Sequence, residues 1–137
     1  MFVDASAIVA ILTREAEADH LADLLEGAAA PITSPIAVFE AVAGICRKRQ
    51  SSVEEAHEDI RQFLTEARIR AIAISDSELN EALGAYSRYG KGRGHAAQLN
   101  LGDCFAYAVA KTQRVSILFK GDDFSRTDIP AAGQMKA

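Results

Sequence analysis

The stretch Met1-Phe2-Val3-Asp4-Ala5-Ser6-Ala7-Ile8-Val9-Ala10-Ile11-Leu12 decides the fold class of this chain. Its first three residues are apolar and predict a short buried strand that ends at Asp4. Ala5 to Leu12 is small and apolar, so we expect a helix to begin directly after the strand. A strand that passes at once into a helix is typical of α/β proteins.

The rest of the chain repeats this alternation of strands and helices. Strands are predicted at 32–33, 69–74 and 115–119, and helices at 15–27, 34–50, 51–67, 75–89 and 103–113. A last short strand is expected near Ile129, and the tail from about Pro130 is expected to fray. Short apolar strands between helices predict a mainly parallel sheet, in which functional groups gather at the carboxyl ends of the strands.

Length and composition predict a single domain, residues 1–137. The chain is 49% hydrophobic and 25% charged, as globular proteins are. No stretch reaches the roughly 20 apolar residues of a membrane span, so no membrane partner is expected. Cys46 and Cys104 are far apart and lack C-x-x-C spacing, which fits a cytoplasmic protein better than a disulfide scaffold or a zinc site.

The distribution of charge is more informative than its total. A net charge of −4 argues at face value against nucleic-acid binding. However, residues 1–46 hold seven acids and one base, whereas residues 47–137 hold 12 acids and 14 bases. Electrostatic coating of nucleic acid is therefore excluded, but an acidic site with basic walls is not.

Acidic residues occupy the positions where a parallel sheet collects functional groups. Asp4 ends the first strand, Asp103 opens the last helix, and Asp122 and Asp123 follow the last strong strand. Glu40 lies in the most apolar helix, where its neighbours three and four positions away carry no charge. Converging carboxylates repel one another and need a cation, and oxygen ligands suit Mg²⁺ or Mn²⁺.

Each acid also has a purely structural interpretation. Asp4 and Asp103 are suitable helix caps, and Asp122 and Asp123 are common turn residues. A rotated helix would expose Glu40 to water. Spacing alone does not prove that these side chains converge.

Four segments add a resemblance that spans nearly the whole chain: Met-Phe-Val-Asp-Ala-Ser at 1–6, Ser-Pro-Ile-Ala-Val-Phe-Glu at 34–40, Leu-Asn-Leu-Gly-Asp-Cys at 99–104, and Leu-Phe-Lys-Gly-Asp-Asp-Phe at 118–124. Together they resemble a PIN domain, and more closely the VapC-type ribonuclease toxins of bacterial toxin–antitoxin pairs. The resemblance implies a three-layer α/β/α fold with a mainly parallel sheet of four to five strands.

The resemblance also implies an active site. It assigns Asp4, Glu40 and Asp103 to a catalytic acid quartet that binds one or two Mg²⁺ or Mn²⁺ ions. We favour Asp122 as the fourth catalytic acid, with Asp123 as an additional or substitute metal ligand. Ser6 matches a supporting hydroxyl position. The implied reaction is hydrolysis of RNA phosphodiesters by metal-activated water.

Basic residues near these acids are candidates for RNA contact. Lys91, Arg93 and His95 lie in a Gly-rich loop before Asp103, and Lys120 and Arg126 flank the last acids. A mobile, solvated loop is an equal alternative for the first three. For the run 47–49 we favour a structural role, because bases at the end of a helix complement its dipole.

The resemblance implies further partners, namely a VapB-like antitoxin and a second copy of the chain in a homodimer. Two other functions stay open: a non-catalytic PIN-like interaction module, or another Mg²⁺-dependent phosphoesterase. Ser6 argues against a haloacid-dehalogenase-like phosphatase, which carries Asp-x-Asp and would place a second Asp at that position.

Overall fold

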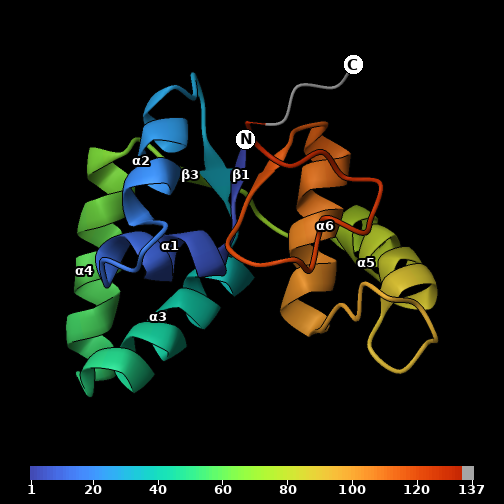
Figure 1. Cartoon of the computed structure of the whole chain (residues 1–137), viewed down its shortest axis with the longest axis horizontal. Coiled ribbons are helices and arrows are strands. Elements are labelled where there is room, and N and C mark those ends of the chain that lie inside the picture. Colours follow the sequence, from blue (N-terminus) through green and yellow to red (C-terminus); the bar gives the residue numbers. More distant parts are fainter. Residues whose placement is uncertain (134–137) are drawn as a thin grey trace.

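A computed structural model describes residues 1–133 of the chain, and its centre is a four-stranded parallel sheet (Figure 1). The strands are β1 (Phe2–Val3), β2 (Ile32–Thr33), β3 (Arg70–Ala71) and β4 (Ile117–Leu118). Their order across the sheet is β3-β2-β1-β4, and all three pairings are parallel. The predicted parallel sheet is therefore confirmed, and β1 lies inside it.

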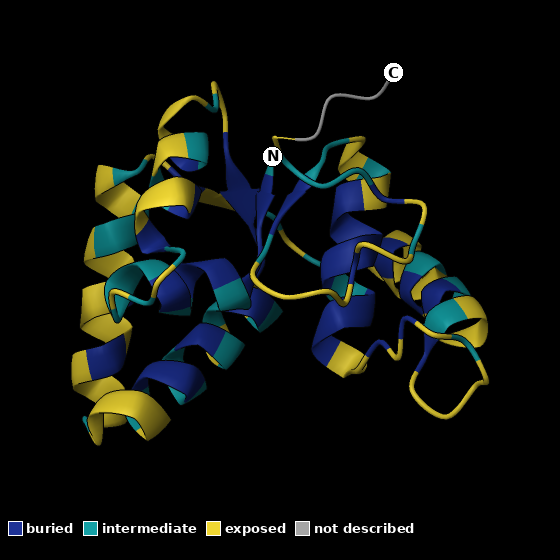
Figure 2. Ribbon diagram, in the orientation of Figure 1, coloured by how far each residue is buried: buried dark blue, intermediate teal, exposed yellow. Residues whose placement is uncertain are grey.

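Six helices cover the two faces of this sheet: α1 (Ala5–Leu12), α2 (Ala18–Glu26), α3 (Pro35–Arg49), α4 (Val53–Glu66), α5 (Asp76–Tyr89) and α6 (Leu101–Gln113). Helices α1 to α4 lie on one side and α5 and α6 on the other (Figures 1 and 2). Alternate strand residues serve the two layers, since Val3 packs with the α1–α4 core and Phe2 with the α5–α6 core. The expected three-layer α/β/α architecture is confirmed.

Local capping explains how two of the helices are placed at the carboxyl end of a strand. The Asp4 carboxylate accepts a hydrogen bond from the backbone N–H of Ser6 and so caps α1. Ser34 caps α3 in the same way through Ala37, and Pro35 fills the first helical position. Because β1 and β2 are parallel neighbours, α1 and α3 both begin at the same edge of the sheet.

Several predicted boundaries were wrong. Helix α6 begins at Leu101 rather than Asp103, because Asn100 and Asp103 form a reciprocal capping box. Helix α2 begins at Ala18 rather than Glu15. The predicted strands 69–74 and 115–119 shrink to two residues each, since only those residues pair with a neighbouring strand.

The carboxyl-terminal segment also differs from the expectation. Ala131 rather than Ile129 forms a bridge, with Ile117 as its partner. Pro130 and Ala132, where we expected fraying, both hydrogen bond with Ile117. Residues 134–137 of that expected tail lie outside the described residues.

Two other expectations concern the whole chain. Cys46 and Cys104 are both free thiols, as their spacing predicts. Within residues 1–133, no helix is long and apolar enough to cross a membrane.

Candidate active site

A pocket of about 340 Å³ collects four of the predicted acids at one edge of the sheet. Asp4, Glu40, Asp103 and Asp123 line it, although they lie far apart in the sequence. Asp122, which we favoured as the fourth acid, does not line this pocket; both Asp122 and Asp123 are exposed, so their position at the pocket separates them and their burial does not. The geometry thus favours Asp123 over Asp122.

Asp4 is the most buried of these acids, with 5% of its surface exposed. The hydroxyl of Ser6 donates a 2.5 Å hydrogen bond to Asp4 Oδ2, in addition to the backbone bond that caps α1. The same Ser6 oxygen accepts a 3.0 Å hydrogen bond from the backbone N–H of Lys120. Ser6 therefore ties Asp4 to the segment that follows β4, and its supporting role in catalysis stays a prediction.

Glu40 reaches the pocket from α3, where it is half-buried. Its carboxylate lies against Gly102 at the start of α6, so closely that a Cβ atom at Gly102 would overlap it. This close approach of α6 to Glu40 requires a glycine at position 102.

Asp103 lies on the first turn of α6, with 8% of its surface exposed. Its Oδ2 accepts a 3.1 Å hydrogen bond from the backbone N–H of Asn100. Asp4 and Asp103 therefore cap helices and also line the pocket. The structural and functional interpretations of these two acids are compatible.

Asp123 is carried by an irregular segment that is fastened to the rest of the molecule on both sides. On its amino-terminal side, Lys120 is held by Ser6. On its carboxyl-terminal side, Phe124 is buried in the core that α5 and α6 form with the sheet. The position of Asp123 thus depends on contacts with two other elements.

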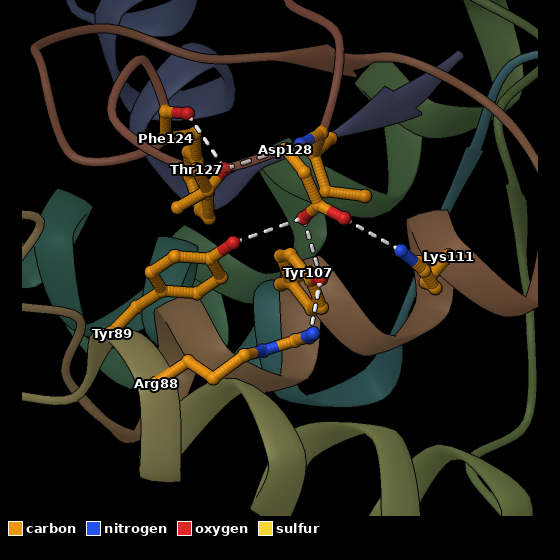
Figure 3. A network of polar contacts seen from close by, with 8 residues as sticks. Arg88, Tyr89, Tyr107, Lys111, Phe124, Thr127 and Asp128 are labelled. Atoms are coloured by element: carbon orange, nitrogen blue, oxygen red, sulfur yellow. Dashed lines mark hydrogen bonds and ion pairs between the residues drawn. The ribbon is translucent and has the colours of Figure 1, made fainter.

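Asp128 provides the strongest of these fastenings (Figure 3). Its carboxylate accepts a 2.6 Å hydrogen bond from the Tyr107 hydroxyl and pairs with Lys111 Nζ at 2.7 Å. Arg88 in turn donates to the Tyr107 oxygen at 2.8 Å. Asp103, Tyr107 and Lys111 are four residues apart on α6, so one face of this helix carries a pocket acid and also anchors the segment that carries Asp123.

Burial and mutual repulsion perturb the acids of the pocket. Burial raises the pKa of Glu40 to about 7, and the charge of Asp4 adds to this effect. Burial likewise raises the pKa of Asp103 to about 7, with the charges of Asp123, Asp4 and Glu40 contributing. The pKa of Asp4 is also raised by burial, against the hydrogen bonds from Ser6. Positive charge near these groups would favour their ionised forms.

The basic residues of the pocket do not supply that charge. Within residues 1–133, no ion pair joins any of the four acids to a lysine or arginine. Lys48 and Lys120 both line the pocket, but their ammonium groups pair with Glu15. The acid cluster is therefore uncompensated by the side chains around it.

The donor set fits a hydrated divalent cation. In the described part of the chain, no three acidic, histidine or cysteine side chains are close enough to chelate one ion by themselves. Mg²⁺ usually keeps several of its waters and binds through only one or two carboxylates, so it does not need such a cage. Asp4, Glu40, Asp103 and Asp123 are the residues that could hold it.

The structure places some of the predicted RNA-contact residues at the acid pocket and others away from it. Lys120 lines the acid pocket, whereas Lys91, Arg93, His95 and Arg126 do not. The Arg93 guanidinium lies over the Tyr86 ring, and the His95 ring packs edge-on against Tyr89.

Three charged residues that line the pocket were given no role at the site by the sequence interpretation: Glu15, Arg47 and Lys48. A signal for the two basic residues was present, because Arg47 and Lys48 lie seven and eight positions after Glu40 on α3. That spacing places them on the same helix face as the acid. Their interpretation as dipole partners overlooked this shared face.

Comparison with known proteins agrees with this fold. The family model of the PIN domain matches residues 1–130. The chain belongs to the PIN-domain family. The resemblance carried by the four sequence segments is thereby confirmed, and the acid pocket lies entirely within the matched region of the PIN domain.

Relatives of this PIN domain are similar over nearly their whole length. A VapC ribonuclease of Rhizobium meliloti is 40% identical in an alignment 139 residues long. The alignment covers 93% of this chain and 98% of the relative. A ribonuclease VapC of Mycolicibacterium smegmatis is 41% identical over 134 residues, with 96% and 98% covered. This PIN domain is thus of the VapC type.

Solved structures share the fold at lower identity. VapC20 of Mycobacterium tuberculosis, described as a toxin that cleaves the sarcin–ricin loop, superposes with a TM-score of 0.73 at 16% identity. That match covers 93% of this PIN domain and 95% of the VapC20 chain. A toxin–antitoxin complex from Klebsiella pneumoniae gives a TM-score of 0.68 at 17% identity, with 93% and 92% covered.

Proposed function

We propose that this chain is a ribonuclease toxin of a VapBC-type toxin–antitoxin pair, and that it hydrolyses RNA phosphodiesters with the help of Mg²⁺ or Mn²⁺. The observation that carries the proposal is a pocket in which four carboxylates converge without a basic partner. The names of the relatives, which are VapC ribonucleases at 34–41% identity, support RNA as the substrate class.

The acids of the pocket have different roles in the proposed reaction. Asp4, Glu40, Asp103 and Asp123 would hold a divalent ion, which would lower the pKa of bound water and so supply hydroxide near neutral pH. Asp4 and Asp103 are fixed by hydrogen bonds from Ser6 and Asn100, and therefore serve as rigid ligands. Glu40 has a pKa of about 7 in the absence of an ion, which suits a group that takes a proton from water.

Asp123 completes the quartet in this proposal, in place of Asp122. Its charge raises the pKa of Asp4 and of Asp103, which indicates that it lies close to both. Asp122 instead accepts a hydrogen bond from Ser125 through its backbone carbonyl, within the turn that follows Gly121. Asp122 does not line the acid pocket.

We also propose a VapB-like antitoxin as the physiological partner, in agreement with the toxin–antitoxin complex among the structural relatives. Homodimerisation, a cytoplasmic location and the organisation of 1–137 as one domain stay predictions. A non-catalytic interaction module is disfavoured, because such a protein gains nothing from buried acids that lack a counter-ion.

The test is cleavage of a structured RNA by the purified full chain, free of antitoxin. We expect cleavage with Mg²⁺ or Mn²⁺, none with excess EDTA, and none from Asp4→Asn or Asp103→Asn proteins that still fold. Cleavage in EDTA, or by both variants, contradicts the metal site.

The fourth acid is tested by a matched pair of variants. Asp123→Asn should reduce the cleavage rate by about 10²-fold or more, as loss of a metal-holding group does. Asp122→Asn should cleave at nearly the wild-type rate. Equal losses in the two variants, or a larger loss in Asp122→Asn, would reverse the assignment.

A further inference from the structure

A cluster of charged residues stands on the rim of the acid pocket: Glu15, Lys48 and Lys120 line it, and Glu17 lies beside them, with its Oε2 3.5 Å from Lys120 Nζ. Glu15 follows α1, and 15% of its side chain is exposed. Its Oε1 pairs with the ammonium of Lys48, and its Oε2 pairs with that of Lys120 at 3.1 Å. One carboxylate therefore holds two lysines, which come from α3 and from the segment after β4.

Both lysines are tied to the acids of the pocket through the backbone. The N–H of Lys120 donates to Ser6, and the Ser6 hydroxyl donates to Asp4, so Lys120 is two hydrogen bonds away from that acid. Lys48 lies eight residues after Glu40 on the same face of α3. The backbone of each lysine is thus placed relative to one of the quartet acids, and all of these residues line one pocket.

The chemistry of this cluster matches a phosphodiester. A carboxylate that offers one oxygen to each of two ammonium groups presents two anionic oxygens, as the non-bridging oxygens of a phosphodiester do. The exposed fractions of the Lys48 and Lys120 side chains are 44% and 40%, so a ligand from solvent can reach them. The lysine ends of these pairs are exposed, and ion pairs at exposed positions add little to folding stability, so another anion can take the place of the carboxylate.

We propose that Lys48 and Lys120 form a binding subsite for a backbone phosphate of the RNA, and that Glu15 occupies this subsite in the free protein. RNA then displaces Glu15 from the lysines when it binds. The inference rests on the proposed function, since it takes RNA to be the ligand of the pocket. It makes Glu15 a competitor of the substrate rather than a helper of catalysis.

The experiment measures binding of a fluorescently labelled single-stranded RNA to the full chain by anisotropy, in EDTA and at several salt concentrations. No hydrolysis is needed for this readout. We expect Lys48→Ala and Lys120→Ala each to weaken binding several-fold and to reduce the slope of log affinity against log salt by about 0.7, as loss of one contact to single-stranded phosphate does. We expect Glu15→Gln to tighten binding several-fold.

A variant cycle separates displacement of Glu15 from a general effect of charge. In a Lys48→Ala, Lys120→Ala background, the added Glu15→Gln change should no longer tighten binding, because the lysines that it frees are absent. The exposed pair of Glu58 and Arg61 on α4 is the matched control. Glu58→Gln and Arg61→Ala should both leave RNA affinity and salt slope unchanged.

The inference is overturned if both lysine variants keep the wild-type affinity and slope. It is also overturned if Glu15→Gln binds no more tightly, or if its gain persists undiminished without the lysines. Failure of the wild-type chain to cleave RNA with Mg²⁺ would instead contradict the proposed function. The two failures are distinguishable because binding is measured without metal.

Discussion

Replacement of Gly102 by alanine tests whether the close approach of α6 and Glu40 matters for activity. Gly102 is the second residue of α6, and an added Cβ would overlap the Glu40 carboxylate. That carboxylate is the free end of a flexible side chain, so it can move away without moving the backbone. Carbon and oxygen atoms pack at about 3.5 Å or more, and clearing the new methyl group requires a shift of about 1 Å or more.

The expected effects on stability and on catalysis are therefore very different. Overpacking costs about 1–3 kcal/mol, while the helix preference for alanine over glycine returns up to about 1 kcal/mol. The net loss of unfolding free energy is about 0–3 kcal/mol, which is smaller than the roughly 5–15 kcal/mol of a typical domain and leaves the chain folded. A displacement of about 1 Å in a catalytic group can cost about 10²-fold in rate, so we expect a loss of that size in cleavage.

Thermal melting and RNA cleavage, measured on the same protein samples, test this reasoning. Gly84→Ala is the control, because Gly84 lies within α5 and has no atom within 4 Å of an added Cβ. It should gain about 0.5–1 kcal/mol in stability and cleave at the wild-type rate. The reasoning is refuted if Gly102→Ala cleaves RNA at the wild-type rate, or if it loses activity only by unfolding.

Three further predictions concern the groups around the site. Ser6→Ala should lower the free energy of unfolding by about 1–2 kcal/mol, as melting curves measure. It should also move the acidic limb of the cleavage–pH profile to higher pH, because the pKa of Asp4 rises without the Ser6 hydroxyl; pH–rate curves measure this. Mg²⁺ should raise the melting temperature more at about pH 8 than at about pH 5.5, since Glu40 and Asp103, with pKa values of about 7, are protonated at the lower pH. Asp128→Asn should cost about 1–2 kcal/mol in urea unfolding at pH 6, given its partial exposure. That difference should vanish as pH falls through about 2, because hydrogen bonds from Lys111 and Tyr107 outweigh burial and lower the Asp128 pKa to about 2.

The sign of the pH effect on the metal-free protein follows from the raised pKa values of Glu40 and Asp103. A folded-state pKa above the unfolded value means that the folded chain holds its proton longer. These two groups therefore contribute stability that is full below the ordinary carboxyl range and is lost as pH rises through about 7. Melting curves without metal should show this decline, and curves with metal should show less of it.

Most of the fold was predictable because its signals are local. Met1 to Asp4 is apolar up to the acid that caps α1, and Ser34-Pro35 begins α3 as predicted. The start of α6 was misplaced, because Gly102 was taken as part of a loop and the Asn100–Asp103 capping box was overlooked. The short strands were overestimated, since pairing with a neighbour decides their length and a single sequence does not show it.

Within the candidate site, the structure brings Asp4, Glu40 and Asp103 together as expected. The choice between Asp122 and Asp123 could be made only from the structure. The two acids are adjacent and chemically identical, so spacing favours neither. Gly121 adopts a φ of 100°, which turns the chain and helps decide which carboxylate enters the pocket. The role of Glu15 was also out of reach, because its two partners are 33 and 105 positions away in the sequence.

The four acids of the pocket come from distant parts of the chain, and this has a consequence during synthesis. Asp4 leaves the ribosome well before Asp123 and the Asp128 anchor do. The pocket cannot assemble until the segment that carries Asp123 has emerged. If the chain cleaves RNA as proposed, a nascent copy has no complete active centre before that point of its synthesis. The order of the acids along the chain would thus protect the machinery that makes the toxin.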